Sequence, residues 1–127
     1  MNENVFSNLA DLDAAYLDAA YAGDAETAII VFEQYLQDLP ANLNLIRESI
    51  TKKDIERFKQ HIHKQKPGYS YVGLTDVTQK FQELQVKCVA IEDLTRYETD
   101  IETVLTRINS STQIIEKALS YLRTQQA

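Results

Sequence analysis

Glycine and proline are scarce in this chain of 127 residues, with only 3 and 2 copies. Sandwiches and barrels need many turns, and turns depend on these two residues, so an all-β fold is nearly excluded. A single cysteine cannot form an internal disulfide, which removes the argument for a secreted scaffold held by disulfides. The longest purely apolar run, Ala28–Phe32, is far too short to cross a membrane.

Basic residues are also in the minority, with 13 Lys and Arg against 19 Asp and Glu. The resulting net charge of −6 argues against a general nucleic-acid binder, which needs cations to neutralise phosphates. The first four residues lack the basic start and apolar core of a signal peptide. No glycine-rich phosphate loop supports an ATP site. We therefore expect a cytoplasmic protein with no membrane or nucleic-acid partner.

Apolar residues recur at steps of three and four along most of the chain, which is the period of an α-helix. This pattern predicts helices over residues 5–22, 25–50, 54–72, 76–94 and 98–123. The fourth stretch has the clearest apolar stripe, with a 4,3,4,3 spacing over Val77, Phe81, Leu84, Cys88 and Ile91. The apolar register of the second stretch continues past Pro40, so we expect a kink there and not a break.

Short polar connections separate these predicted helices, and Asp24 and Asp54 stand where a side chain could cap the next helix. Long amphipathic helices with short connections favour antiparallel neighbours. The sequence thus predicts one all-α domain over residues 1–127, an up-and-down antiparallel four-helix bundle with an additional N-terminal helix. A monomer is expected, although the sequence leaves the oligomeric state open.

The two histidines, His61 and His63, lie on the third predicted helix. The helical angle turns His63 away from the apolar stripe and leaves His61 at its edge. Neutral imidazole is a good nucleophile toward phosphorus, and its ordinary pKa of ~6.5 keeps it mostly neutral near pH 7. Lys66, one turn on, could offset the charge of a phosphoryl group. Pro67 and Ser70 are small and leave space above His63, although an ordinary solvated face would look similar.

The segment that begins at His63 resembles the signature of histidine-containing phosphotransfer (HPt) domains. That signature is a histidine followed by lysine at plus three, a small residue at plus seven, an aliphatic residue at plus nine and glycine at plus ten. Lys66, Ser70, Val72 and Gly73 match it. The resemblance covers roughly residues 12 to 122. It implies a four-helix bundle with His63 as phosphoacceptor and Lys66 as the group that stabilises the phosphoryl oxygens.

Gln85 and Pro67 are the two further positions that bear on this resemblance. In some family members a glutamine on the next helix lies beside the histidine, and Gln85 matches it, 22 residues after His63. Pro67 stands where the family has glycine. Proline removes the amide that would bond to the His63 carbonyl and disfavours helical geometry at Lys66, which predicts a bend at this turn.

The resemblance implies a phosphocarrier that takes a phosphoryl group from one receiver-domain aspartate and passes it to another. Its partners would be response-regulator receiver domains and a hybrid sensor histidine kinase. It would need no cofactor of its own, since Mg²⁺ would belong to the receiver. Tyr71, Leu74 and Val77 are candidates for one end of the docking surface.

Other readings of the same residues remain. The departure at Pro67 favours an HPt-like adaptor that binds receivers without accepting phosphate, and an unrelated helical bundle could share the pattern by chance. A metal pair at His61 and His63 is disfavoured, because side chains two residues apart on a helix diverge. Cys88 lies on the core stripe and is expected to be a small buried hydrophobe.

Overall fold

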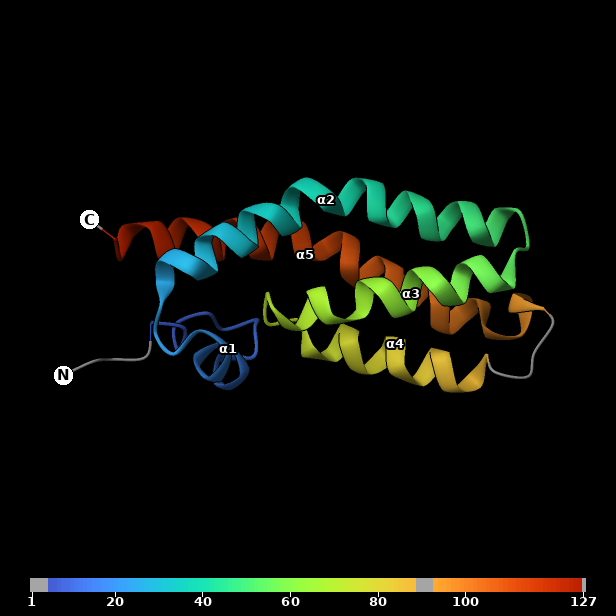
Figure 1. Ribbon diagram of the computed structural model, residues 1–127, viewed down its shortest axis with the longest axis horizontal. Coiled ribbons are helices and arrows are strands. Elements are labelled where there is room, and N and C mark those ends of the chain that lie inside the picture. The colour runs from blue at the N-terminus through green and yellow to red at the C-terminus, as the bar shows by residue number, and fades with distance from the viewer. Residues whose placement is uncertain (1–4, 89–92, 127) are drawn as a thin grey trace.

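The computed structural model describes residues 5–88 and 93–126, and all regular secondary structure in this part of the chain is helical (Figure 1). No strand occurs within the described residues. The structure begins with the short helix α1, and the later helices are longer except for one 3₁₀ turn, η1. The bounds are α1 Ala14–Tyr21, α2 Ala25–Thr51, α3 Ile55–Ser70, α4 Thr75–Lys87, η1 Leu94–Tyr97 and α5 Glu98–Thr124. The predicted all-α class is thereby confirmed.

Aspartate side chains set the starts of the first three helices. The carboxylates of Asp13, Asp24 and Asp54 accept hydrogen bonds from backbone amides three residues later, at 3.0 to 3.1 Å. Each bond satisfies an amide that has no partner inside the helix. The caps expected at Asp24 and Asp54 are therefore confirmed.

Two of the expected helix boundaries are wrong. The first helix starts at Ala14 and not at residue 5, because Asp13 caps it there and residues 5–12 form turns. The fourth helix ends at Lys87 and not near Leu94. Asp93 is extended and caps η1 through the Thr95 amide, which is incompatible with one continuous helix. The predicted core position Ile91 lies outside the described residues.

Both prolines lie inside helices that continue past them. Pro40 is within α2 and Pro67 within α3. Pro67 has no backbone N–H, so the His63 carbonyl does not accept the helical hydrogen bond that residue 67 would otherwise donate. The carbonyl of Pro67 itself still accepts from the Tyr71 amide at 3.3 Å. Helical geometry therefore extends through the turn that carries His63 and Lys66.

The four long helices lie side by side in Figure 1. Helix α3 packs against both α2 and α4, while α5 packs against α2 and α4. Four phenylalanines are among the fully buried side chains, which identifies the space between the helices as the core: Phe6, Phe32, Phe58 and Phe81. The expected core residues Tyr69 and Cys88 are buried as well. In the described part of the chain, none of the helices combines the length and apolarity that a bilayer span requires.

The N-terminal segment packs against the connection between α3 and α4. The Asp13 amide donates to the Gly73 carbonyl at 2.9 Å, and the Thr75 hydroxyl donates to the Asp13 carboxylate at 2.8 Å. The Tyr21 hydroxyl donates to the Tyr71 carbonyl at 2.6 Å. These bonds hold α1 beside the end of α3, which limits how far that end can move.

Candidate functional site

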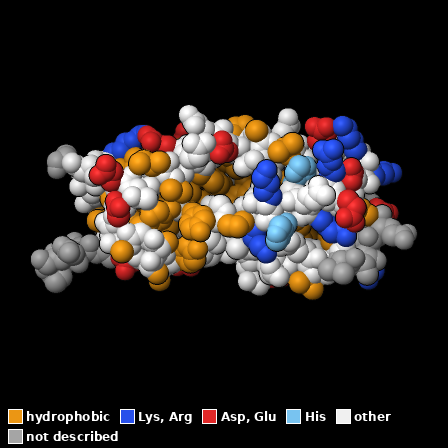
Figure 2. Space-filling model, viewed as in Figure 1, with side chains coloured by type: hydrophobic (Ala, Val, Ile, Leu, Met, Phe, Trp, Pro, Cys, Tyr) orange, Lys and Arg blue, Asp and Glu red, His pale blue; other side chains and the backbone are white. Residues whose placement is uncertain are grey.

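The two histidines differ in exposure as the helical angle predicts. His63 is exposed and His61 is partly buried at the edge of the core. Figure 2 shows both rings on one face of the molecule, with Lys and Arg side chains around them. His63 is thus open to another molecule.

Gln85, on α4, contacts both His63 and Lys66, which lie on α3. Its side-chain nitrogen lies 2.9 Å from Nδ1 of His63, and its oxygen accepts from Nζ of Lys66 at 2.6 Å. Helices α3 and α4 pack closely, so residues far apart in sequence meet at this point. The structure therefore brings together His63, Lys66 and Gln85, the three residues singled out for chemistry.

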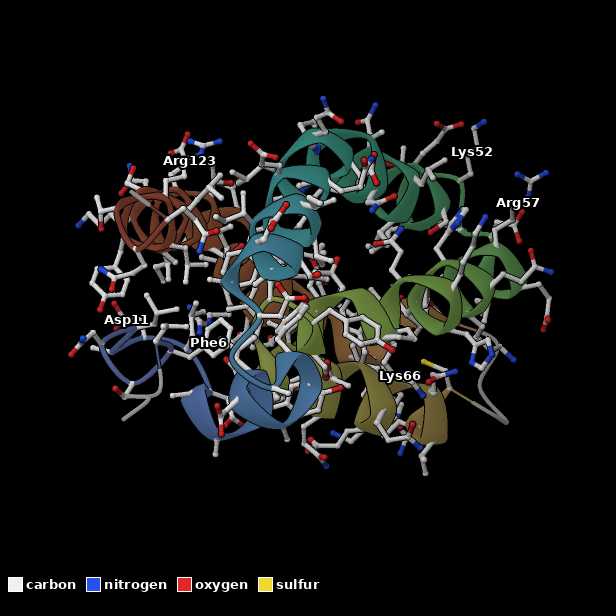
Figure 3. All side chains as sticks on the ribbon, turned by 60° about the vertical axis from the view of Figure 1, so that its left-hand side comes forward. Phe6, Asp11, Lys52, Arg57, Lys66 and Arg123 are labelled. Atoms are coloured by element: carbon white, nitrogen blue, oxygen red, sulfur yellow. The ribbon has the colours of Figure 1, made fainter. Side chains whose placement is uncertain are left out.

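Lys66 has a second hydrogen-bond partner on α4. Its Nζ also donates to the Gln82 side-chain oxygen at 2.6 Å, and Figure 3 shows the labelled Lys66 on the α3 side of the contact with α4. Among the described residues, no carboxylate forms an ion pair with Lys66. Amide oxygens orient an ammonium group without neutralising it, so its full charge is available to an anion.

Positive charge is concentrated along α3 and the turn before it, although the chain is acidic overall. Six of the 13 Lys and Arg fall within residues 52–66, where only two acidic residues occur. The net charge of the whole chain is −6. Helix α3 and the turn before it therefore form a local cationic region that attracts anionic groups.

Pro67 and Ser70 have different surroundings. Pro67 is exposed, and the space around the adjacent Gly68 is open, since a Cβ added there would meet no atom within 4 Å. Ser70 is buried, and its hydroxyl lies 2.7 Å from that of Thr78 on α4. Thr78 in turn donates to the Lys66 carbonyl at 3.2 Å. Pro67 thus lies at the surface, whereas Ser70 belongs to the contact between α3 and α4.

Only one of the three residues expected at the docking surface is exposed to solvent. Tyr71 is 48% exposed, but Leu74 and Val77 are fully buried, so their assignment to a docking surface is wrong. Leu74 immediately precedes α4 and Val77 lies on the apolar stripe of that helix, so both side chains pack into the core. Val86, which the sequence analysis did not single out, is 64% exposed on α4.

Sequence reasoning also missed Thr78 and Gln82. Both belong to a polar stripe on α4 with Gln85, because the three positions follow a 4,3 spacing. That spacing puts them on one helical face beside the apolar stripe. The signal was present in the sequence, but only the packing of α3 shows that this stripe faces Lys66 and Ser70.

In the part of the chain that the structure describes, no cluster of metal-ligating side chains competes for His63, Lys66 or Gln85. Within residues 5–88 and 93–126, His, Cys, Asp and Glu side chains form no group of three that could hold a metal ion.

Comparison with known proteins adds no further assignment: no family model, no curated protein and no solved structure matches this chain.

Proposed function

We propose that this protein is a histidine phosphotransfer protein, in which His63 carries a phosphoryl group between receiver-domain aspartates of a two-component phosphorelay. The observation that carries the proposal is the geometry at His63. The ring is exposed, its Nδ1 lies against Gln85, and Gln85 also contacts the ammonium of Lys66. A nucleophile, an orienting amide and a cation for the phosphoryl oxygens are thus adjacent.

The same proposal includes the architecture that the resemblance implies. The four long helices would form an up-and-down antiparallel four-helix bundle, with α1 as an additional N-terminal helix. The side-by-side packing of α2, α3, α4 and α5 supports this arrangement. In such a bundle the exposed ring of His63 on α3 is accessible to a partner without a movement of the helices.

The proposed reaction uses the second ring nitrogen of His63. Nδ1 is covered by Gln85, so Nε2 is the nitrogen that faces an incoming group. The Nε2 lone pair would attack the phosphorus of an aspartyl phosphate, and the bond between phosphorus and the aspartate oxygen would break with its electrons on the carboxylate. The product is a phosphorylated ring that carries its proton on Nδ1. Lys66 would offset the charge on the phosphoryl oxygens.

The proposed partners are response-regulator receiver domains and a hybrid sensor histidine kinase in the cytoplasm. The receiver would supply the Mg²⁺, and this chain would use no cofactor, membrane or nucleic acid. The cationic region over residues 52–66 supports an acidic partner such as a receiver's aspartate cluster, because opposite charges steer association. A monomer would suffice for this task.

Incubation with phosphorylated receivers tests the proposal. Radiolabel should pass to the wild-type protein as an acid-labile, base-stable phosphoramidate. His63→Gln should take up none, while the matched control His61→Gln, changed on the same helix, should retain uptake. Equal labelling of the wild type and His63→Gln would contradict the assignment.

An adaptor that binds receivers without transfer is the second candidate, and Pro67 is the observation that favours it. Proline within α3 removes the hydrogen bond that the amide of residue 67 would donate to the carbonyl of His63, the phosphoacceptor itself. Under this alternative, receivers would be retained by the immobilised protein, yet no receiver would label His63. Replacing the proline with glycine in Pro67→Gly, the residue that the resemblance implies at this position, should then produce labelling.

A further inference from the structure

The orientation of the Gln85 amide has a chemical consequence for His63. An ammonium has hydrogen-bond donors only, so the Gln85 atom 2.6 Å from Lys66 Nζ must be the carbonyl oxygen. The amide nitrogen then faces His63 Nδ1 at 2.9 Å, and it too can only donate. Nδ1 must accept this bond with its lone pair. A neutral ring in this arrangement carries its proton on Nε2.

This resting tautomer is inactive for the proposed reaction. With a proton on Nε2, the exposed nitrogen of His63 has no lone pair in the ring plane to attack phosphorus. Attack requires the other tautomer, with the proton on Nδ1. That tautomer needs an acceptor beside Nδ1, and Gln85 provides one only if its amide turns its oxygen toward the ring.

We propose that Lys66 is a positioning residue that selects the tautomer of His63 through Gln85, and so couples arrival of an anionic phosphoryl group to activation of the ring. At rest Lys66 holds the Gln85 oxygen away from His63. An incoming phosphoryl group attracts the ammonium, which forms no ion pair with a carboxylate among the described residues. The released amide turns its oxygen toward the ring. Solvent water takes the proton from Nε2 and supplies one to Nδ1 of the exposed ring, so that Nδ1–H donates to the Gln85 oxygen and Nε2 has a free lone pair.

The partners of Lys66 make this exchange feasible. Both of its hydrogen bonds go to neutral amide oxygens on α4, from Gln82 and Gln85, so a dianionic phosphoryl group offers a stronger attraction than either. Gln82 also keeps the ammonium at the contact between α3 and α4 until an anion arrives. The inference rests on the proposed function, because that function gives the exchange its purpose. The structural part concerns only the side chains of Lys66, Gln85 and His63.

Histidine tautomers can be read directly from two-bond ¹H–¹⁵N correlation spectra of ¹⁵N-labelled protein. Spectra at about pH 9 observe the neutral rings, because the ordinary pKa of imidazole is ~6.5. The chain has two histidines, and His63→Gln assigns the His63 signals. His61 serves as an internal reference, since it makes no contact with Gln85 among the hydrogen bonds of the described residues.

We expect wild-type His63 to be almost entirely in the Nε2–H form. Lys66→Met should raise the Nδ1–H population several-fold, because Gln85 is then free to turn. Lys66→Arg should restore the wild-type spectrum, since arginine also has donors only. Lys64→Met is the matched control: it deletes the same charge next to His63 and should leave the spectrum unchanged.

Gln85→Glu provides a second variant that does not depend on Lys66. A carboxylate can only accept, so it should move the His63 proton to Nδ1. The inference is overturned if wild-type His63 is mainly Nδ1–H, or if Lys66→Met and Lys64→Met give the same spectrum. These measurements need no receiver, so a failure of phosphotransfer would remove the proposed function and leave the tautomer result standing, and the converse also holds.

Discussion

The backbone amide of Asp13 donates a hydrogen bond to the carbonyl of Gly73, at 2.9 Å, although the two residues are 60 positions apart. Gly73 has a φ of 81°, in the left-handed region. This close approach joins the start of α1 to the connection between α3 and α4. It therefore links the N-terminal segment to the helices that carry the candidate site.

Gly73→Ala should destabilise the protein strongly. A Cβ at residue 73 would lie 2.8 Å from the Leu12 Cβ and 3.0 Å from the Leu17 Cδ1, and an alanine is strained at positive φ. The left-handed conformation costs roughly 1–2 kcal/mol and overpacking about 1–3 kcal/mol. We expect the free energy of unfolding, measured by urea denaturation, to fall by about 2–5 kcal/mol.

Gly68→Ala is the matched control for that change. Residue 68 lies inside α3, and an added Cβ would meet nothing within 4 Å. Alanine is preferred to glycine in a helix by about 0.5–1 kcal/mol, so this variant should be slightly more stable than the wild type. Equal losses of stability for both variants would contradict the contact at Gly73.

Thr78→Val should lower the stability of the protein, because it removes one member of the Ser70–Thr78 hydroxyl pair between α3 and α4. The change leaves the buried Ser70 hydroxyl without the partner that lies 2.7 Å away. An unsatisfied buried hydroxyl costs about 1–3 kcal/mol. Urea denaturation should show a loss of that size, whereas Thr106→Val, at an exposed position on α5, should change stability by less than about 0.5 kcal/mol.

A double-mutant cycle separates the hydroxyl pair from simple packing effects. In the combination of Ser70→Ala with Thr78→Val no polar group of the pair remains unsatisfied. The double variant should therefore lose less stability than the sum of the two single changes, with a coupling of about 0.5–3 kcal/mol. Strict additivity would show that the two hydroxyls do not interact.

Asp13→Asn should reduce the sensitivity of the protein to acid. Hydrogen bonds from the Tyr16 amide and the Thr75 hydroxyl hold the pKa of Asp13 below its ordinary value. A depressed folded-state pKa stabilises the protein above the unfolded-state pKa of ~3.9, and this contribution is lost as pH falls through the folded-state pKa. Asparagine caps helices as well as aspartate but does not titrate.

Free energies of unfolding of Asp13→Asn and the wild type, measured from about pH 6 down to about pH 2.5, test this expectation. The variant should lose less stability than the wild type on acidification. Asp11→Asn is the matched control, because it removes an exposed carboxylate near Asp13 that does not accept the Tyr16 and Thr75 hydrogen bonds, and it should not reproduce the effect of Asp13→Asn. Parallel curves for the wild type and Asp13→Asn would show that this carboxylate does not contribute.

Several features could be read from the sequence because they depend on residues close together along the chain. Helical periodicity predicted the all-α class, the burial of Tyr69 and Cys88 and the exposure of His63. The caps at Asp24 and Asp54 need only an amide three residues away. Such local effects depend on the spacing of residues along one helix, so they can be predicted without knowing which helix packs beside it.

Other features were decided by contacts between segments that lie far apart in sequence. The 4,3 spacing of Thr78, Gln82 and Gln85 defines a polar stripe, but only the packing of α4 on α3 turns that stripe toward Lys66 and His63. Burial of Leu74, against expectation, has the same origin, because the core is completed by helices from the whole chain. Spacing along one helix defines its faces, whereas the neighbour that covers each face depends on the burial of all the helices together.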